Sequence, residues 1–340
     1  MTEMNKTWVL RHRPVGEIKE GDLELVETPL VPLEEGQVRA KTVYLSLDPT
    51  NRIWMSDMDA YLPPVGIGDP MRGGGLAMVV ESRHEGFQQG DIVNTGLGIW
   101  TLYATLQGDG LAKLPRLPGV PLTAFMGPLG ATGMTAYFGL MDIGKPQPGE
   151  TVVVSAAAGA VGSMVGQIAK IQGCRVVGIA GSEDKCRWLT EVAGFDAAIN
   201  YKAEDVGAAL DRHCPNGIDI NFENVGGTIM DEVIARLNDF SRMPLCGMIS
   251  TYNATGPVPG PANFANFLMR RTLVKGFIVI DYFPRFPEGI QQMAQWLMEG
   301  KLKFETDIVK GFENAPASLS RLFEGKNLGK LVVEVSPPPQ

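Results

Sequence analysis

The stretch TVVVSAAAGAVGSMVGQIAK, residues 151–170, decides the fold. It opens with a short β-branched run at 151–155, passes through a turn of small residues, and ends in a segment whose apolar side chains recur at helical spacing. The turn places Ala157, Gly159 and Gly162 in the pattern A-x-G-x-x-G, a variant of the dinucleotide fingerprint. Gly159 would let a pyrophosphate approach the backbone, and Gly162 would let the helix pack close to the strand. A tight turn of small residues is the alternative, but the strand–turn–helix context favours a nucleotide site.

From about residue 125 onward, strand-like runs alternate with helical segments. This alternation is typical of parallel βαβ units, and six strands fit a doubly wound sheet. Along the chain the predicted strands are 151–155, 175–180, 197–200, 218–223, 245–249 and 273–280, and the predicted helices between them include 163–172, 184–193 and 228–237.

The flanking regions have a different pattern. Residues 1–125 contain short alternating runs, such as 23–27 and 38–45, between frequent Pro and Gly residues, which is typical of a β-rich barrel or sandwich. At the C-terminal end, we predict helices at 288–297 and 315–323 and strands at 304–309 and 331–335. We therefore expect a β-rich domain at 1–125, completed by about 305–340, and a nucleotide-binding domain at 126–304.

Composition excludes several function classes. The chain has 340 residues, 44% of them hydrophobic and 20% charged, which suits two globular domains. A net charge of −8 without a basic block argues against nucleic acid or an anionic membrane as partner. No signal peptide or apolar run of about 18 residues is evident, so we expect a cytoplasmic protein. The four cysteines and three histidines lack metal-ligand spacing, so we expect no metal and no oxidation through a zinc-bound alkoxide.

The end of the second predicted strand bears on cofactor choice. Glu183 lies about where an acidic side chain would bind the ribose of NADH. However, the strand ends in the neutral pair Gly181 and Ser182, and Ser182 suits a helix N-cap, which places Glu183 in the first helical turn. Lys185 then follows within reach of a 2′-phosphate, although it could also be a solvated helix lysine. We therefore predict NADPH.

Several strings closely resemble the prostaglandin reductase/leukotriene B4 12-hydroxydehydrogenase group of the medium-chain dehydrogenase/reductase superfamily, which includes alkenal/one and curcumin reductases. The resemblance spans nearly the whole chain. The strings are SAAAGAVGS at 155–163, GS at 181–182 with Lys185, NYK at 200–202, FENVGG at 222–227, CGMISTYN at 246–253, GFEN at 311–314, NLGK at 327–330, LSLDP at 45–49 and MRG at 71–73.

The resemblance implies a GroES-like catalytic domain interrupted by a Rossmann domain, an active site between them, and zinc-independent, NADPH-dependent reduction of a C=C bond conjugated to a carbonyl. Two departures from the group are Glu223, where Asp is more usual, and the acidic Glu183 and Asp184 beside Lys185. The cofactor-binding residues that the resemblance implies are Gly159, Ala160, Val161, Gly162, Lys185, Tyr201, Asn224, Cys246, Ser250, Thr251, Tyr252, Phe277, Ile278, Val279 and Asn327.

Tyr252 is the candidate catalytic residue. It follows the predicted strand 245–249 at the carboxyl end, where open α/β sheets bind ligands, and its phenol could donate to an enolate oxygen. Packing against the nicotinamide is the alternative role. Two other functions stay open: quinone reduction, and nucleotide binding without catalysis.

The substrate and the oligomeric state have weaker signals. The apolar run 273–280 resembles an edge strand that needs covering, so we predict a homodimer joined there, partly by analogy with relatives of this fold. The aromatic and apolar side chains that could line a substrate pocket, or equally belong to the core or a dimer surface, are Phe264, Phe267, Met269, Tyr282 and Phe283.

Overall fold

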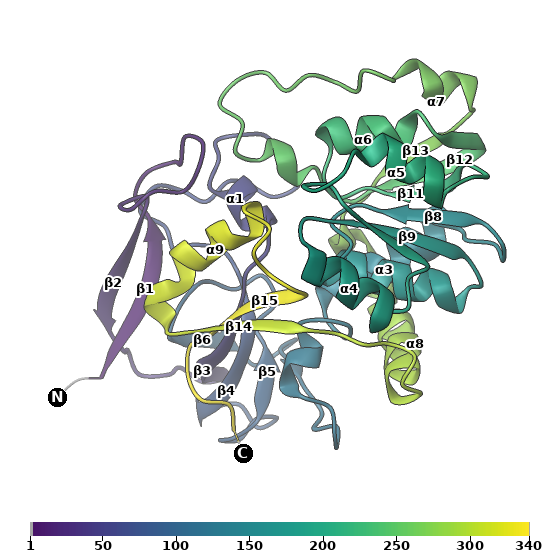
Figure 1. Cartoon of the computed structure of the whole chain (residues 1–340). Coiled ribbons are helices and arrows are strands. Elements are labelled where there is room, and N and C mark those ends of the chain that lie inside the picture. The colour runs from purple at the N-terminus through teal and green to yellow at the C-terminus, as the bar shows by residue number, and fades with distance from the viewer. Residues whose placement is uncertain (1–2, 340) are drawn as a thin grey trace. The chain divides into compact units, whose positions relative to one another are not determined.

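The computed structural model describes residues 3–339, and the chain divides into two compact units (Figure 1). Unit 1 takes the chain up to Thr123, together with Asp307–Lys326 and the residues from Leu331 onward. Unit 2 takes Ala124–Thr306 and the short segment Asn327–Lys330. The four residues Asn327–Lys330 therefore leave unit 1 and pack with unit 2.

Unit 1 is built on antiparallel strands. A seven-stranded sheet has the order β14-β15-β3-β4-β5-β7, with β6 also paired to β3, and β1 and β2 form a separate pair. Its strands are β1 Met4–Leu10, β2 Leu23–Pro29, β3 Gln37–Ser46, β4 Gly75–Ser82, β5 Ile92–Asn94, β6 Tyr103–Gln107, β7 Ala112–Lys113, β14 Thr306–Lys310 and β15 Lys330–Glu334. Its helical segments are α1 Thr50–Trp54, α9 Ala315–Phe323 and the 3₁₀ turn η5 Phe312–Asn314.

The core of unit 1 joins both ends of the chain. Leu45 and Leu47, at the end of β3, pack in one cluster with Trp100, Phe312 and Leu331, which are all buried. The runs predicted at 23–27, 38–45 and 331–335 appear as β2, β3 and β15, and the helix predicted at 315–323 is α9. The apolar residues of these runs therefore located the strands correctly, and β3 and β15 are buried along most of their length.

Unit 2 is a doubly wound parallel sheet. Its strand order is β10-β9-β8-β11-β12-β13. Starting from β8, the chain adds β9 and β10 on one side and then returns to add β11, β12 and β13 on the other. The strands are β8 Thr151–Val154, β9 Arg175–Ala180, β10 Ala197–Asn200, β11 Ile218–Phe222, β12 Leu237–Leu245 and β13 Leu273–Gly276. Its helices are α2 Ala131–Phe138, α3 Ala160–Ile171, α4 Glu183–Glu191, α5 Val206–His213, α6 Gly227–Ile234, α7 Ala265–Met269 and α8 Phe286–Met298. Shorter helical segments are η1 Leu122–Phe125, at the boundary of the units, the π-helix η2 Gly139–Gly144, and the 3₁₀ turns η3 Ile249–Thr251 and η4 Val279–Arg285.

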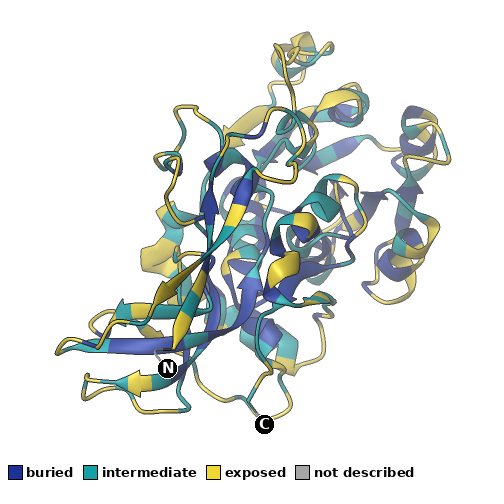
Figure 2. Ribbon diagram, turned by 90° about the vertical axis from the view of Figure 1, so that its left-hand side faces the viewer, coloured by how far each residue is buried: buried dark blue, intermediate teal, exposed yellow. Residues whose placement is uncertain are grey.

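Right-handed crossovers explain how the helices of unit 2 are distributed. The connections through α3 and α4 run in one direction from β8, and those through α5 and α6 run in the other, so the two pairs cover opposite faces. On the α5 and α6 face, a buried apolar cluster joins these helices to the strands. Buried residues concentrate on strands and inward helix faces, and exposed ones on loops (Figure 2). Along residues 3–339 no helix is long and apolar enough to cross a membrane.

Two predicted strands were wrong in extent. The run 245–249 is not a strand, because β12 ends at Leu245 and the apolar residues after it turn into η3. The true strand begins at Leu237 and was hidden by polar residues and by a bulge at Phe240, whose φ is +59°. The run 273–280 forms a strand only over Leu273–Gly276 and then turns into η4.

Candidate nucleotide and active site

The glycine turn lies between β8 and α3. Gly159 is the N-cap of α3, and no side chain among the described residues caps it. Gly159, Ala160 and Val161 are partly exposed, so the helix N-terminus offers backbone N–H groups to an anion. A Cβ on Gly162 would lie 2.5 Å from the Ala156 oxygen and 2.8 Å from Ala157 Cα, so only glycine allows this close helix–strand packing. The turn therefore fits a dinucleotide pyrophosphate.

Sequence reasoning missed the conformational role of Ala156. Ala157, which stands at the first glycine of the fingerprint, is fully buried. Ala156 instead takes the left-handed conformation, with φ +48°, and its oxygen accepts from the Gly159 N–H at 3.0 Å. Within a run of three alanines, local sequence has no signal that distinguishes this position.

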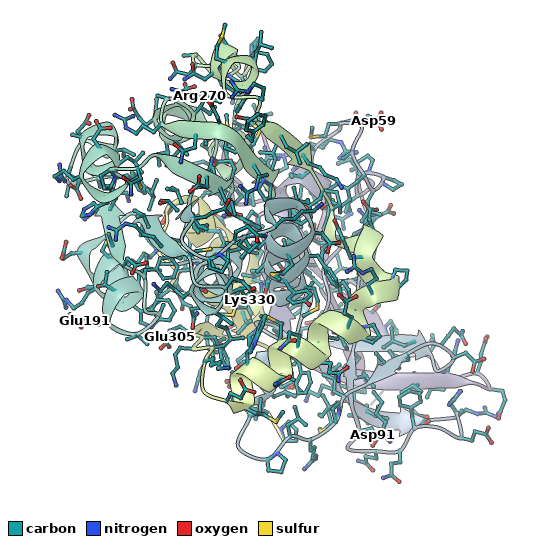
Figure 3. The ribbon with its side chains drawn as sticks, turned by 90° about the vertical axis from the view of Figure 1, so that its right-hand side faces the viewer. Asp59, Asp91, Glu191, Arg270, Glu305 and Lys330 are labelled. Atoms are coloured by element: carbon teal, nitrogen blue, oxygen red, sulfur yellow. The ribbon has the colours of Figure 1, made fainter. Side chains whose placement is uncertain are left out.

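The segment Asn327–Lys330 packs against the same turn. The Gly329 N–H donates to the Ala158 oxygen (2.8 Å), and Asn327 Nδ2 donates to the Gly329 oxygen (3.0 Å). The Lys330 N–H donates to the Glu305 oxygen (3.0 Å), which joins two residues labelled in Figure 3. Gly329 has φ +68°, and a Cβ there would lie 2.7 Å from the Glu305 carbonyl carbon. The structure therefore places Asn327 beside the glycine turn, far from it in sequence.

Two predicted cofactor residues, Lys185 and Tyr201, follow the ends of β9 and β10. Ser182 is the N-cap of α4, as predicted, and its hydroxyl accepts from the Lys185 N–H (3.4 Å). Tyr201 follows β10, and its ring lies against Gly181, where a Cβ would be 3.0 Å from the phenolic oxygen. Glu183 is exposed in the first turn of α4, whereas Lys185 is half-buried. The sequence did not single out Lys202, whose ammonium lies 5.8 Å from the Tyr201 ring centre.

Glu223 organises the middle of the carboxyl edge. Its side chain is fully buried directly after β11 and accepts hydrogen bonds from the Ser155 hydroxyl (2.9 Å), Asn221 Nδ2 (3.0 Å), and the backbone N–H groups of Val225 (2.7 Å) and Gly226 (2.8 Å). Its carboxylate therefore joins the end of β8 to the loop after β11.

Asn224, a predicted cofactor residue, is fixed by the same junction. Its N–H donates to the Ser155 hydroxyl (2.8 Å), and its side-chain amide donates to the Ser155 oxygen (2.7 Å). Sequence reasoning missed Ser155 as a contact residue, although its position at the end of a strand beside the glycine turn was a usable signal.

The segment 246–252 is tied to that loop. The Cys246 N–H donates to the backbone oxygen of Glu223 (2.9 Å), and the Ser250 hydroxyl donates to the backbone oxygen of Val225 (2.6 Å). The Thr251 hydroxyl donates to the Met248 oxygen (2.8 Å). Burial, reinforced by the nearby Glu223 charge, raises the pKa of the Cys246 thiol to about 12. The thiol is therefore protonated near neutral pH and is a poor nucleophile toward electrophilic substrates.

Tyr252 ends the 3₁₀ turn η3 rather than following a strand directly. Its ring is half-buried, and its phenolic oxygen accepts a hydrogen bond from the Met248 N–H (3.1 Å). A Cβ on Gly247 would lie 3.0 Å from that oxygen, so the glycine leaves room for it.

Phe277, Ile278 and Val279 follow β13 and are each half-buried. The Phe277 ring meets Phe222, the last residue of β11, edge to face at 6.2 Å. Every predicted cofactor residue thus belongs to unit 2, and most follow the carboxyl ends of its strands.

The five candidate pocket residues do not form one cluster. Phe264 and Phe267 meet edge to face at α7, with centroids 5.6 Å apart. Tyr282 stacks on Phe138 at 4.8 Å, beside η4. Met269 and Phe283 are exposed. These residues therefore belong to two separate regions of unit 2.

The comparisons with known proteins match both units. Residues 6–114 match the model "N-terminal domain of oxidoreductase", and residues 160–297 match "Zinc-binding dehydrogenase". The chain is 46% identical to the NADPH-dependent curcumin reductase of Escherichia coli K12 over 339 residues, 98% of each chain. It belongs to the medium-chain dehydrogenase/reductase superfamily. Within it, 2-alkenal reductase (NADP(+)-dependent) of Nicotiana tabacum is 41% identical over 98% of each chain.

A solved medium-chain dehydrogenase/reductase has the same fold. CurA from Vibrio vulnificus, crystallised in complex with NADPH, is 44% identical, with a TM-score of 0.92, covering 98% of this chain and 100% of that one. The predicted family and fold class are therefore confirmed. Although the second family model carries zinc in its description, residues 3–339 hold no group of three or more His, Cys, Asp or Glu side chains placed to bind a metal ion.

Proposed function

We propose that the protein is an NADPH-dependent reductase of the C=C bond in α,β-unsaturated aldehydes and ketones. Unit 2 would be its Rossmann NADPH-binding domain, and unit 1 its GroES-like catalytic domain. The observation that carries the proposal is the position of Tyr252: a phenol anchored by the Met248 N–H (3.1 Å) on the segment that is tied to Glu223 and Val225 at the sheet's carboxyl edge. The identity to curcumin and 2-alkenal reductases supports the same chemistry.

The chain's own residues supply binding and a proton donor. When bound, NADPH supplies a hydride, which an enone accepts at the carbon β to its carbonyl. Charge then develops on the carbonyl oxygen, and the Tyr252 hydroxyl donates a hydrogen bond to that oxygen, stabilising the transition state more than the ground state. The bond that the phenol accepts from Met248 polarises its O–H and strengthens this donation. Solvent delivers the proton to the α-carbon.

A substrate panel tests the proposal. Enals, alkyl enones, aryl enones and quinones are each offered to the purified protein, and NADPH consumption is followed together with product identity. We expect saturated aldehydes and ketones as products from the enals and enones. Consumption with quinones alone would favour the alternative reductase activity, and tight NADPH binding without any turnover would favour a non-catalytic protein.

We expect NADPH to bind about ten- to a hundredfold more tightly than NADH, because a lost contact to a charged group costs about 1.5–3 kcal/mol. Lys185→Ala should remove most of that preference by weakening NADPH, with NADH affinity unchanged. Arg187→Ala is the matched control, since Arg187 lies on the same helix and pairs with the exposed Asp184 (3.5 Å). Dissociation constants from fluorescence titration decide the matter, and equal constants for the two cofactors in the wild type would contradict the assignment.

We also propose that activity requires no metal. The protein treated with chelator and then dialysed should retain full turnover, because Tyr252 rather than a Lewis acid polarises the carbonyl. Elemental analysis is the second measurement. One tightly held zinc per chain, together with activity lost on chelation and restored by zinc, would refute this.

We further propose that the protein works in the cytoplasm, where four unpaired cysteines are expected.

We also propose a homodimer joined through β13. β13 is the last strand of its sheet; Leu273 and Val274 are 52% and 38% exposed. Leu268 and Met269, just before Arg270 (Figure 3), are also exposed. An exposed apolar edge needs covering. Light scattering at micromolar concentration should give twice the chain mass, and Val274→Glu should lower it; a monomeric wild type would rule this interface out.

A further inference from the structure

We propose that Gly139 is a positioning residue for the nicotinamide half of the cofactor. The absence of a Cβ at Gly139 lets the Phe277 ring pack against Phe222, and this packing fixes the backbone of residues 277–279. The inference rests on the proposed function, because residues 277–279 are assigned to the cofactor only by the family resemblance. They follow β13, which lies on the opposite side of β8 from β9 and β10. A dinucleotide that crosses the sheet at the glycine turn, with its 2′-phosphate half at Lys185, would place its nicotinamide half on this side.

Gly139 has no space for a side chain. It is buried and is the first residue of the π-helix η2, directly after α2. A Cβ at this position would lie 2.8 Å from Phe222 Cε2 and closer still to Phe277 Cζ. Its backbone is ordinary right-handed helix, with φ −59°, so close contact and not conformation requires the glycine. π-Helical turns are rare and frequently occur at functional sites.

The ring that occupies this space is attached to a short segment. Phe277 directly follows β13, and η4 begins at Val279, so only Phe277 and Ile278 lie between the strand and the turn. Phe222 is fully buried at the end of β11, immediately before Glu223. Fixing the Phe277 ring on Phe222 therefore fixes this connecting backbone relative to the carboxyl edge of the sheet.

A second ring contact also holds this segment. Tyr282 meets Phe277 edge to face at 6.3 Å and stacks on Phe138 at 4.8 Å with an interplanar angle of 16°. The Arg285 guanidinium lies 4.8 Å from the Phe138 ring centre and pairs with Asp142 of the π-helix. The segment 277–285 is thus attached to η2 at both ends, through Phe277 at Gly139 and through Arg285 at Asp142.

The test compares Gly139→Ala with Gly144→Ala, the same change at the other end of the π-helix. A Cβ on Gly144 would have more space, because the nearest atoms are Leu140 Cδ1 at 3.1 Å, Ile220 Cγ2 at 3.5 Å and Pro244 Cγ at 3.7 Å. Two ligands are titrated: NADPH, and 2′-phospho-ADP-ribose, which lacks the nicotinamide ring. For Gly139→Ala we expect NADPH affinity to fall roughly tenfold, since the strain of overpacking is relieved by displacing Phe277. Affinity for 2′-phospho-ADP-ribose should change less than about twofold by the same reasoning, and Gly144→Ala should leave both affinities unchanged.

A double variant keeps the proposal falsifiable if Gly139→Ala folds poorly. Phe277→Leu replaces the ring that the new Cβ would contact with a shorter side chain. The double variant Gly139→Ala with Phe277→Leu should therefore fold and bind NADPH better than Gly139→Ala alone. The proposal would be overturned if Gly139→Ala lost affinity equally for both ligands or lost none for either. It would also be overturned if the double variant bound NADPH no better than Gly139→Ala. These results are distinct from a failure of the proposed function, which the substrate panel on the wild type reveals independently.

Discussion

Tyr252→Phe is expected to lower turnover of the best enone substrate by about ten- to a thousandfold, the range found when one donor to a developing oxyanion is removed. The substitution keeps the ring and removes only the hydroxyl. The hydroxyl is the group that the Met248 N–H anchors at 3.1 Å and that Gly247 leaves room for. Steady-state kinetics on the enone, with NADPH affinity measured separately, gives the result.

The pattern of the kinetic constants separates the catalytic role from a packing role. A donor that acts only in the transition state should lower kcat and kcat/KM together, with NADPH affinity nearly unchanged. Tyr103→Phe is a matched control, because it removes a phenolic hydroxyl that donates to Glu3 (2.7 Å) in unit 1, outside the candidate site. Wild-type turnover in Tyr252→Phe would show that Tyr252 only forms a wall of the site.

Glu223→Ala is expected to lower the free energy of unfolding by about 2–6 kcal/mol. The carboxylate is the acceptor for the part-buried N–H group of Val225 and the buried N–H group of Gly226, and each such donor left without an acceptor costs about 1–3 kcal/mol. Because the same carboxylate joins Ser155 to the loop that carries Asn224, NADPH affinity should fall as well. Urea denaturation and cofactor titration measure the two effects.

Glu223→Gln is the control for this prediction. Its amide oxygen can still accept from Val225 and Gly226, and its NH₂ group would face Asn221. The Asn221 Oδ1 atom is buried without a hydrogen-bond partner among the described residues, so this side chain can turn to accept. We expect the Gln variant to lose only about 1 kcal/mol, as when one hydrogen bond is weakened. A Gln variant as unstable as the Ala variant, or an Ala variant as stable as wild type, would contradict the role of Glu223 as an acceptor.

The backbone structure of the candidate cofactor site was predictable where its signal is local. The fingerprint at Gly159 and Gly162 and the cap at Ser182 depend on residues a few positions apart, and the structure has the turn and the cap at those positions. The roles of the fifteen site residues in binding and catalysis stay predictions, tested by the Lys185 and Tyr252 variants above. The error at 245–249 arose because an apolar run has the same composition in a buried strand and in a half-buried turn.

The sequence by itself determined the parallel sheet, the glycine turn, the β-rich remainder and the chemical family, because hydrophobic period, turn residues and motif strings are all properties of short segments. Only the tertiary structure decided which residues support the site. Ala156 takes a left-handed conformation, Gly329 joins the glycine turn, and Gly139 gives room to Phe277, each because of contacts with backbone or rings that packing brings near. Such requirements depend on the space left by residues distant in the chain, and that space exists only after the sheet and helices have packed.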